Sequence, residues 1–163
     1  MVVLGIDPGT ATTGYGVVKD AQDGRLTEIC HGVIRTDSKM PYPQRLAKIH
    51  ERINLLIEQY KPDVVSIEEL FFNKNVSTAL SVGQARGVVI LTSVLAGLEL
   101  SEYTPLQVKE AVTGYGRAEK MQVQQMVKVL LGLPEIPKPD DAADALAVAI
   151  CHLHSYKMKR LTE

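Results

Sequence analysis

The N-terminal part of the chain alternates short apolar runs with turn residues. Residues 2–7 are apolar up to a final aspartate, which predicts a buried strand. A second strand begins near Gly14, the dipeptide Asp23-Gly24 marks a hairpin, and residues 26–35 form a third strand. Three strands joined by such short turns predict an antiparallel meander.

The hydrophobic pattern then changes to the period of helices. Apolar positions three and four residues apart predict an amphipathic helix over 43–60, and a buried strand over 64–68 follows it. The later elements are a long apolar helix over 75–98, a short strand over 100–104, and helices over 105–112, 119–131 and 140–156. This order predicts an α/β fold: a mixed β-sheet, in which the antiparallel three-strand meander is extended by parallel strands, flanked by helices.

Length and composition place the chain among single-domain globular proteins. Its 163 residues are 45% hydrophobic and 23% charged. We assign residues 1–156 to one domain and 157–163 to a short C-terminal tail. No apolar stretch reaches the roughly 20 residues that span a bilayer, and no signal peptide pattern opens the chain. We therefore expect a cytoplasmic protein with no membrane partner, in which Cys30 and Cys151 are free thiols.

Four carboxylates interrupt segments that should be buried. Asp7 and Glu68 close two apolar strands, and Asp141 and Asp144 open a helix of alanine, leucine and valine. Strand ends meet at one edge of an α/β sheet, and residues three apart share a helix face, so the four acids can converge. Because an unpaired buried charge is costly, we expect one shared cation site, and carboxylate ligands suit Mg²⁺ or Mn²⁺.

Each acid also has a purely structural interpretation. Asp7 precedes a proline and a glycine and could simply start a turn. Asp140 fits a helix N-cap, a task that Asp141 could share. Glu69 is interpreted as a solvated neighbour of Glu68. Four acids at element ends nevertheless favour one common cause over four separate ones.

The glycine-rich hairpin from Gly5 to Gly14 is a second feature. Glycines let a backbone approach a phosphate closely. A similar hairpin occurs in the ATP-binding superfamily of actin, sugar kinases and heat-shock chaperones, so an ATP-dependent kinase or ATPase is a rival. Those proteins are more than twice this length and need a second phosphate loop and an adenosine pocket, which the sequence does not show.

Four motifs follow one another along the chain. They are Gly5-Ile6-Asp7-Pro8-Gly9, Ile67-Glu68-Glu69 with Phe71, Gly83-Gln84-Ala85-Arg86-Gly87, and Asp141-Ala142-Ala143-Asp144-Ala145-Leu146. In this combination they resemble the RuvC family of bacterial Holliday junction resolvases. The resemblance extends from residue 2 to about His154, which is nearly the whole chain.

The resemblance implies a ribonuclease H-like fold, a homodimer, and a crossover junction endodeoxyribonuclease. Such an enzyme resolves Holliday junctions in recombination and repair by paired, symmetric, metal-dependent nicks in two strands of like polarity. The expected partners are four-way junction DNA and the branch-migration proteins RuvA and RuvB, and the expected place of action is the bacterial nucleoid. The helix over 76–98 could supply the dimer interface, or its apolar side chains could fill the monomer core.

The resemblance also implies roles for single residues. The family's Ile-Glu and Asp-Ala-Ala-Asp patterns favour Glu68 over Glu69 and Asp141 over Asp140. The implied catalytic and metal-binding acids are Asp7, Glu68, Asp141 and Asp144. They would hold two ions per active site, Mg²⁺ or Mn²⁺. The implied DNA contacts are Phe71, Lys109, Lys120, Arg86 and Lys74.

These DNA contacts have plain alternatives. Phe71 matches an aromatic side chain that stacks on an unpaired base, but it could lie in the core, and Phe72 could exchange roles with it. Lys109 and Lys120 match lysines near the scissile phosphate, and by spacing alone they are ordinary surface lysines. Two further rivals are a nuclease of the same fold that cuts RNA–DNA hybrids or single strands, and a junction-binding protein without catalysis.

Overall fold

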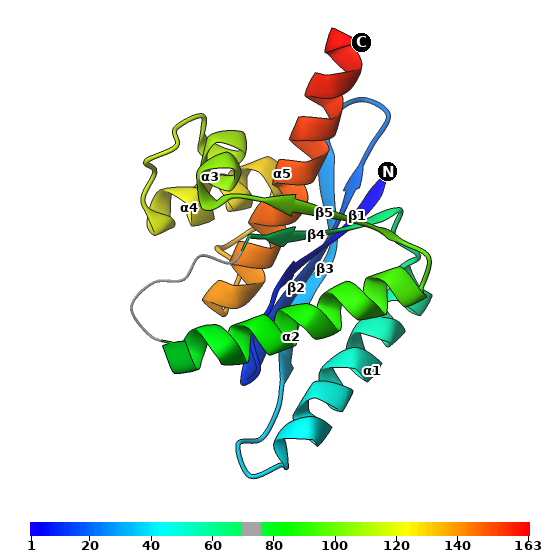
Figure 1. Ribbon diagram of the computed structural model, residues 1–163. Helices are drawn as coiled ribbons and strands as arrows, with labels where there is room; N and C mark the ends of the chain where they lie inside the picture. Colours follow the sequence, from blue (N-terminus) through cyan, green and yellow to red (C-terminus); the bar gives the residue numbers. More distant parts are fainter. Residues whose placement is uncertain (70–75) are drawn as a thin grey trace.

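The structure is a computed structural model that describes residues 1–69 and 76–163. It contains a five-stranded sheet in the order β3-β2-β1-β4-β5 (Figure 1). The strands are β1 (Val2–Asp7), β2 (Thr12–Asp20), β3 (Leu26–Arg35), β4 (Val64–Glu68) and β5 (Glu99–Tyr103). β2 runs antiparallel to β1 and β3, whereas β4 runs parallel to β1 and β5. The predicted mixed sheet is thereby confirmed.

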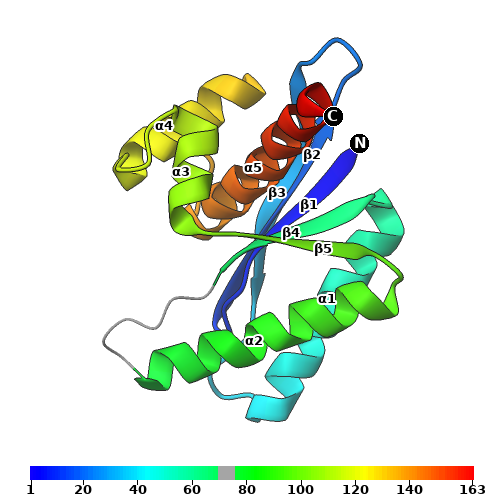
Figure 2. The ribbon, with the colours of Figure 1, turned by 45° about the horizontal axis from the view of Figure 1, so that its top comes forward.

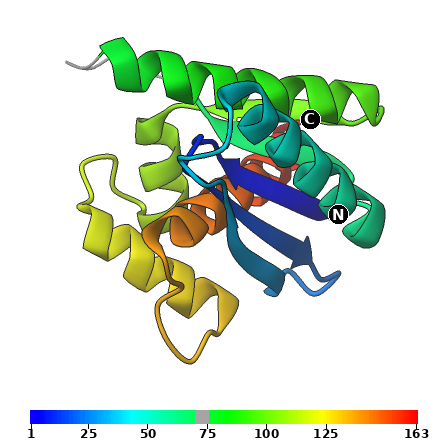
Figure 3. The same cartoon turned by 90° about the horizontal axis from the view of Figure 1, so that it is seen from below.

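Helices cover both faces of this sheet. α1 (Tyr42–Tyr60) and α2 (Val76–Leu95) lie on one face, and α5 (Asp140–Thr162) crosses the other (Figure 3). α3 (Pro105–Thr113) and α4 (Lys120–Leu131) pack mainly against α5 (Figure 2). The sheet is therefore the middle layer, and α5 is the element that joins it to the smaller helices.

Each face of the sheet has its own apolar core. In β1, Leu4 and Ile6 belong to the core beneath α1 and α2, whereas Val3 belongs to the core beneath α5. Alternate residues of a strand point to opposite faces, and a strand that is covered on both faces becomes apolar throughout. This two-sided burial explains why the acid at the end of β1 is conspicuous.

Glycines let α5 lie close to the sheet. A Cβ atom added at Gly5 would overlap the backbone carbonyl of Ala145, and one at Gly14 would overlap the backbone carbonyl of Asp141. A backbone carbonyl within a helix cannot rotate away as a side chain can. These two glycines therefore set how near the first turns of α5 come to β1 and β2.

The end of α2 differs from the prediction. The sequence pattern placed it at residue 98, whereas the helix ends at Leu95. Gly97 adopts a positive φ of 75°, and the backbone N–H of Leu98 donates to the carbonyl of Ser93 over 3.0 Å. The prediction ran too far because the residues of this turn are small or apolar, like those of the helix before it.

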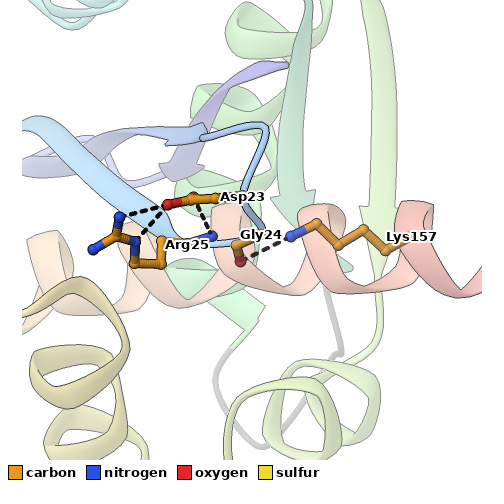
Figure 4. Close-up of polar contacts among 4 residues, drawn as sticks. All are labelled: Asp23, Gly24, Arg25 and Lys157. Atoms are coloured by element: carbon orange, nitrogen blue, oxygen red, sulfur yellow. Dashed lines mark hydrogen bonds and ion pairs between the residues drawn. The ribbon is translucent and has the colours of Figure 1, made fainter.

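The last helix is longer than expected. α5 continues to Thr162 instead of ending at Tyr156, so the residues assigned to a tail continue the helix. Within this extension, the ammonium group of Lys157 contacts Asp20 at 2.9 Å and the carbonyl of Gly24 at 3.2 Å. Figure 4 shows Lys157 reaching Gly24 in the β2–β3 hairpin. This long-range contact ties Lys157 to the β2–β3 hairpin, and residues 158–163 beyond it are exposed.

One helix among the described residues, α2, is long and apolar enough by length and composition to cross a membrane. The sequence pattern predicts no such stretch, since Thr92 and Ser93 interrupt the apolar run. Core helices of soluble proteins have the same composition. Here α2 packs against α1 and β5, and its Arg86 forms an ion pair with Glu102 of β5.

Candidate active site

Two of the predicted acids lie side by side at the carboxyl ends of neighbouring strands. β1 and β4 are parallel, and their last paired residues are Ile6 and Ile67. Asp7 and Glu68 follow these residues directly. Both line one pocket together with Asp144 of α5. The pocket therefore lies outside the carboxyl ends of the strands, where open α/β sheets bind their ligands.

Asp141 reaches the same place through the close packing of α5. Gly14 is the partner of Asp7 in the β1–β2 ladder, and the backbone of Asp141 lies directly over Gly14. In addition to burial, Asp141 raises the pKa of Asp7 through its charge and a side-chain hydrogen bond, which indicates that the two carboxyl groups are neighbours. Asp144 lies three residues further along α5, on the same helix face. The structure thus brings all four predicted acids together.

Burial and the crowding of these acids raise the pKa of Asp7. Burial, followed by the negative charges of Asp144 and Asp141, raises the pKa of Asp7 from 3.8 to about 8. A carboxyl group near several others avoids ionisation because like charges repel in a poorly solvated site. Such a shift is typical of functional clefts.

Two lysines oppose this negative charge. Partial burial and the charge of Asp144 raise the pKa of Glu68, whereas Lys109 of α3 and Lys120 of α4 act to lower it. The ammonium group of Lys120 lies 3.6 Å from a carboxylate oxygen of Asp144. Both lysines line the pocket, so the structure places these two predicted DNA-contacting residues beside the acids.

The donor set fits a divalent cation. Within residues 1–69 and 76–163, no three acidic, histidine or cysteine side chains converge closely enough to coordinate one ion as arranged. Mg²⁺ does not require such a cage, because it usually takes one or two carboxylates and completes its shell with waters and substrate phosphate. A bound cation would also favour the charged form of Asp7 and so offset the repulsion among the acids.

The glycine-rich hairpin has a structural task. The hydroxyl group of Thr10 lies 2.8 Å from the hydroxyl of Ser81 in α2, and Thr36 donates to the carbonyl of Thr10 over 2.6 Å. The hydroxyl of Thr13 donates to the carbonyl of Gly9 over 2.6 Å. These contacts hold the β1–β2 turn against α2, and they give no support to the ATP-binding alternative.

The remaining predicted DNA contacts are only partly described. Phe71, its alternative Phe72, and Lys74 lie outside the described residues. Arg86 is described, and its guanidinium group lies 2.6 Å from Glu102, with only 16% of the side chain exposed. Its role on DNA stays a prediction.

The expectation for Asp140 was wrong. The N-cap of α5 is Pro139, and Asp140 is the first residue of the helix itself. Its carboxylate instead lies 3.3 Å from the ammonium group of Lys120 and accepts a hydrogen bond from Gln124 over 3.1 Å. Sequence reasoning missed this cluster because its two helices come together only in the fold. The sequence signal that could have pointed to this cluster was an acid directly before the Asp-Ala-Ala-Asp motif.

Known proteins resemble the chain over almost its full length. The family model described as crossover junction endodeoxyribonuclease RuvC matches residues 3–152. The protein of that name from Syntrophomonas wolfei is 55% identical over 163 residues, which is 100% of this chain and 94% of the relative. Thermus thermophilus RuvC superposes with a TM-score of 0.91 at 38% identity, covering 98% of this chain and 97% of that one. The structure of T. thermophilus RuvC in complex with a Holliday junction substrate matches with a TM-score of 0.89 at 35% identity, covering 97% and 96%.

Proposed function

Because the chain belongs to the RuvC family of crossover junction endodeoxyribonucleases, we propose that it resolves four-way DNA junctions by hydrolysing phosphodiester bonds at the carboxylate pocket. The observation that carries this proposal is the convergence of acids from β1, β4 and α5 at one end of the sheet. The likeness to T. thermophilus RuvC in complex with a Holliday junction substrate supports four-way DNA as the ligand.

Membership of this family implies a divalent-metal-dependent nuclease. In our proposal Asp7, Glu68, Asp141 and Asp144 hold two ions, with Mg²⁺ as the first candidate and Mn²⁺ as the second. Bound cations supply Lewis acidity and lower the pKa of a coordinated water, which is the chemistry that phosphodiester hydrolysis needs. The residues themselves bind and orient, so the proposal requires no separate protein base.

The lysines of the pocket would bind the DNA backbone. Lys109 and Lys120 lie beside the acids and can contact phosphate oxygens as point charges. Lys74 and Arg86 are weaker candidates, and Arg86 would first have to leave Glu102. Phe71 follows Glu68 by three residues, and we keep it as the proposed stacking residue at the junction centre.

We also infer that two copies of the chain act together. A four-way junction offers two equivalent strands related by near two-fold symmetry, and a symmetric dimer matches them. α2 supports this inference because its solvent-facing side is apolar: Leu80, Leu91 and Val94 are 58–60% exposed. These residues share one face of the helix, which fits an interface between copies better than contact with water.

Other assignments follow from family membership alone. RuvA and RuvB are the expected partners in branch migration, and the bacterial cytoplasm, at the nucleoid, is the expected place of action. We keep residues 1–156 as the proposed nuclease domain.

A substrate comparison tests the proposed function. Purified protein in Mg²⁺ would be offered a synthetic immobile junction, a duplex of the same sequence, an RNA–DNA hybrid and a single strand. We expect symmetric nicks in two strands of like polarity on the junction alone. Preferential cutting of the hybrid or of single strands would identify a different nuclease of this fold. Turnover of ATP without cutting would favour the kinase or ATPase alternative.

A further inference from the structure

We propose that Asp140, which is not among the four proposed metal-binding acids, is a positioning residue that holds Lys120 at the edge of the active site. This inference rests on the proposed function in one respect, namely that Asp144 serves as a metal-binding acid. Lys120 is the first residue of α4 and Asp140 the first residue of α5. The ammonium group lies 3.3 Å from Asp140 and 3.6 Å from Asp144.

A buried amide fixes the orientation of Asp140. Gln124 lies one turn after Lys120 on α4, with only 6% of its surface exposed. Its Nε2 donates to Oδ1 of Asp140 over 3.1 Å, while Oδ2 of the same carboxylate faces Lys120. Lys120 and Gln124 therefore lie on the same face of α4, and each contacts one oxygen of the Asp140 carboxylate. Exposed ion pairs usually contribute little, in part because fixing two side chains in one geometry costs entropy, and the bond from Gln124 already fixes Asp140.

The shared ammonium group suggests what Asp140 contributes. Asp144 has two prospective partners, Lys120 and a divalent cation. A carboxylate that forms an ion pair with Lys120 is less available to coordinate the cation. Asp140 gives Lys120 a second carboxylate partner. Asp144 can then coordinate the cation while Lys120 stays beside the pocket. Without Asp140, Lys120 would keep its ion pair with Asp144 or move into solvent. Either outcome would weaken cation binding or misplace the lysine that meets the phosphate.

A simpler role for Asp140 has to be distinguished. An acid in the first turn of a helix stabilises the helix through its dipole, whatever lysine lies nearby. That role predicts a loss of stability, and it predicts the same loss whether Lys120 is present or absent. The positioning role predicts that the effect of Asp140 disappears once Lys120 has been removed.

The test compares Asp140→Asn, Lys120→Ala and the double variant of the full-length protein. Nitrogen-15 NMR of the lysine side chains reports the surroundings of Lys120 without requiring activity. Glu135→Gln is the matched control, since Glu135 is an exposed acid of the same α4–α5 connection that lines a different pocket. We expect the Lys120 signal to shift in Asp140→Asn and to stay in place in the control.

Single-turnover cleavage of the junction provides the second measurement. Asp140→Asn should slow cleavage about two- to fivefold, the range of an exposed ion pair, with little change in junction affinity. In the Lys120→Ala background the same substitution should add nothing, and Asp140→Glu should restore part of the rate. Equal losses in both backgrounds, or an unmoved Lys120 signal, would overturn the proposal.

A second variant keeps the proposal testable if Asp140→Asn does not fold. Gln124→Leu keeps the volume of the side chain and removes the donor that orients Asp140. It should shift the Lys120 signal in the same direction as Asp140→Asn, and an unchanged signal counts against the proposal. If the wild-type protein did not cut junctions at all, the proposed function would fail, while the NMR comparison would still decide whether Asp140 positions Lys120.

Discussion

Replacing Gly14 by alanine should disable the site without touching any acid. The added Cβ atom would lie 3.0 Å from the Cβ of Asp141 and would overlap the backbone carbonyl of that residue. Ordinary carbon contacts are about 3.5–4.0 Å, so the first turn of α5 would have to retreat by on the order of 1 Å. This displacement would move Asp141 away from Asp7. Asp7 is the residue that pairs with Gly14 in the β1–β2 ladder.

The expected losses follow from this displacement. Overpacking of this kind costs about 1–3 kcal/mol of stability. A misplacement of about 1 Å among reacting groups can lower the rate roughly 100-fold. We therefore expect Gly14→Ala to remain folded, to bind the junction, and to cleave it about two orders of magnitude more slowly.

The assay combines single-turnover cleavage in Mg²⁺ with junction binding in EDTA and thermal unfolding. Gly32→Ala is the matched control, because the atoms nearest to its Cβ would be those at the end of the Tyr15 side chain in the same sheet. It should cost some stability and leave the cleavage rate within about threefold of wild type, since a flexible side chain can move aside. If Gly14→Ala cleaved as fast as this control, the approach of α5 would not be what assembles the site.

Three further predictions concern charge and assembly. Without divalent ions, stability should fall as pH rises from about 4 to 8, because the unfolded chain releases the Asp7 proton near 3.8 and the folded protein keeps it until about 8. Asp7→Asn should flatten this dependence in thermal unfolding with EDTA, and an unchanged slope would contradict the assigned cause. Lys109→Ala and Lys120→Ala should each reduce the salt dependence of junction binding by about one unit of slope, whereas Lys48→Ala on α1 should not. Leu91→Glu should convert a dimer into a folded monomer by light scattering and abolish paired nicking; an unaltered dimer would place the interface elsewhere.

The sequence was sufficient for the sheet and for the acids at its edge. Asp7 and Glu68 were recognisable because each carboxylate closes a mostly apolar strand, where an unpaired buried charge is costly. The order of strands and helices then placed both strand ends at the same edge. These are properties of short segments, which is why they can be read without knowing the fold.

What the sequence could not supply were contacts between distant segments. Gly14 is visible as a glycine, but nothing local shows that Asp141 lies over it. The same holds for the ion pair between Arg86 and Glu102 of β5, which no local pattern in the sequence shows. Asp140 was assigned from its position before a helix, where capping is the common role, and its contact with Lys120 appears only when α4 and α5 meet.

In the proposed function, Asp7, Glu68, Asp141 and Asp144 act as one metal-dependent site on a single phosphodiester. Its most direct test is cleavage of an immobile four-way junction by Asp7→Asn in Mg²⁺, with junction affinity measured on the same preparation. We expect cleavage to fall to background while affinity stays near that of the wild type. Undiminished nicking by a folded Asp7→Asn protein would contradict it.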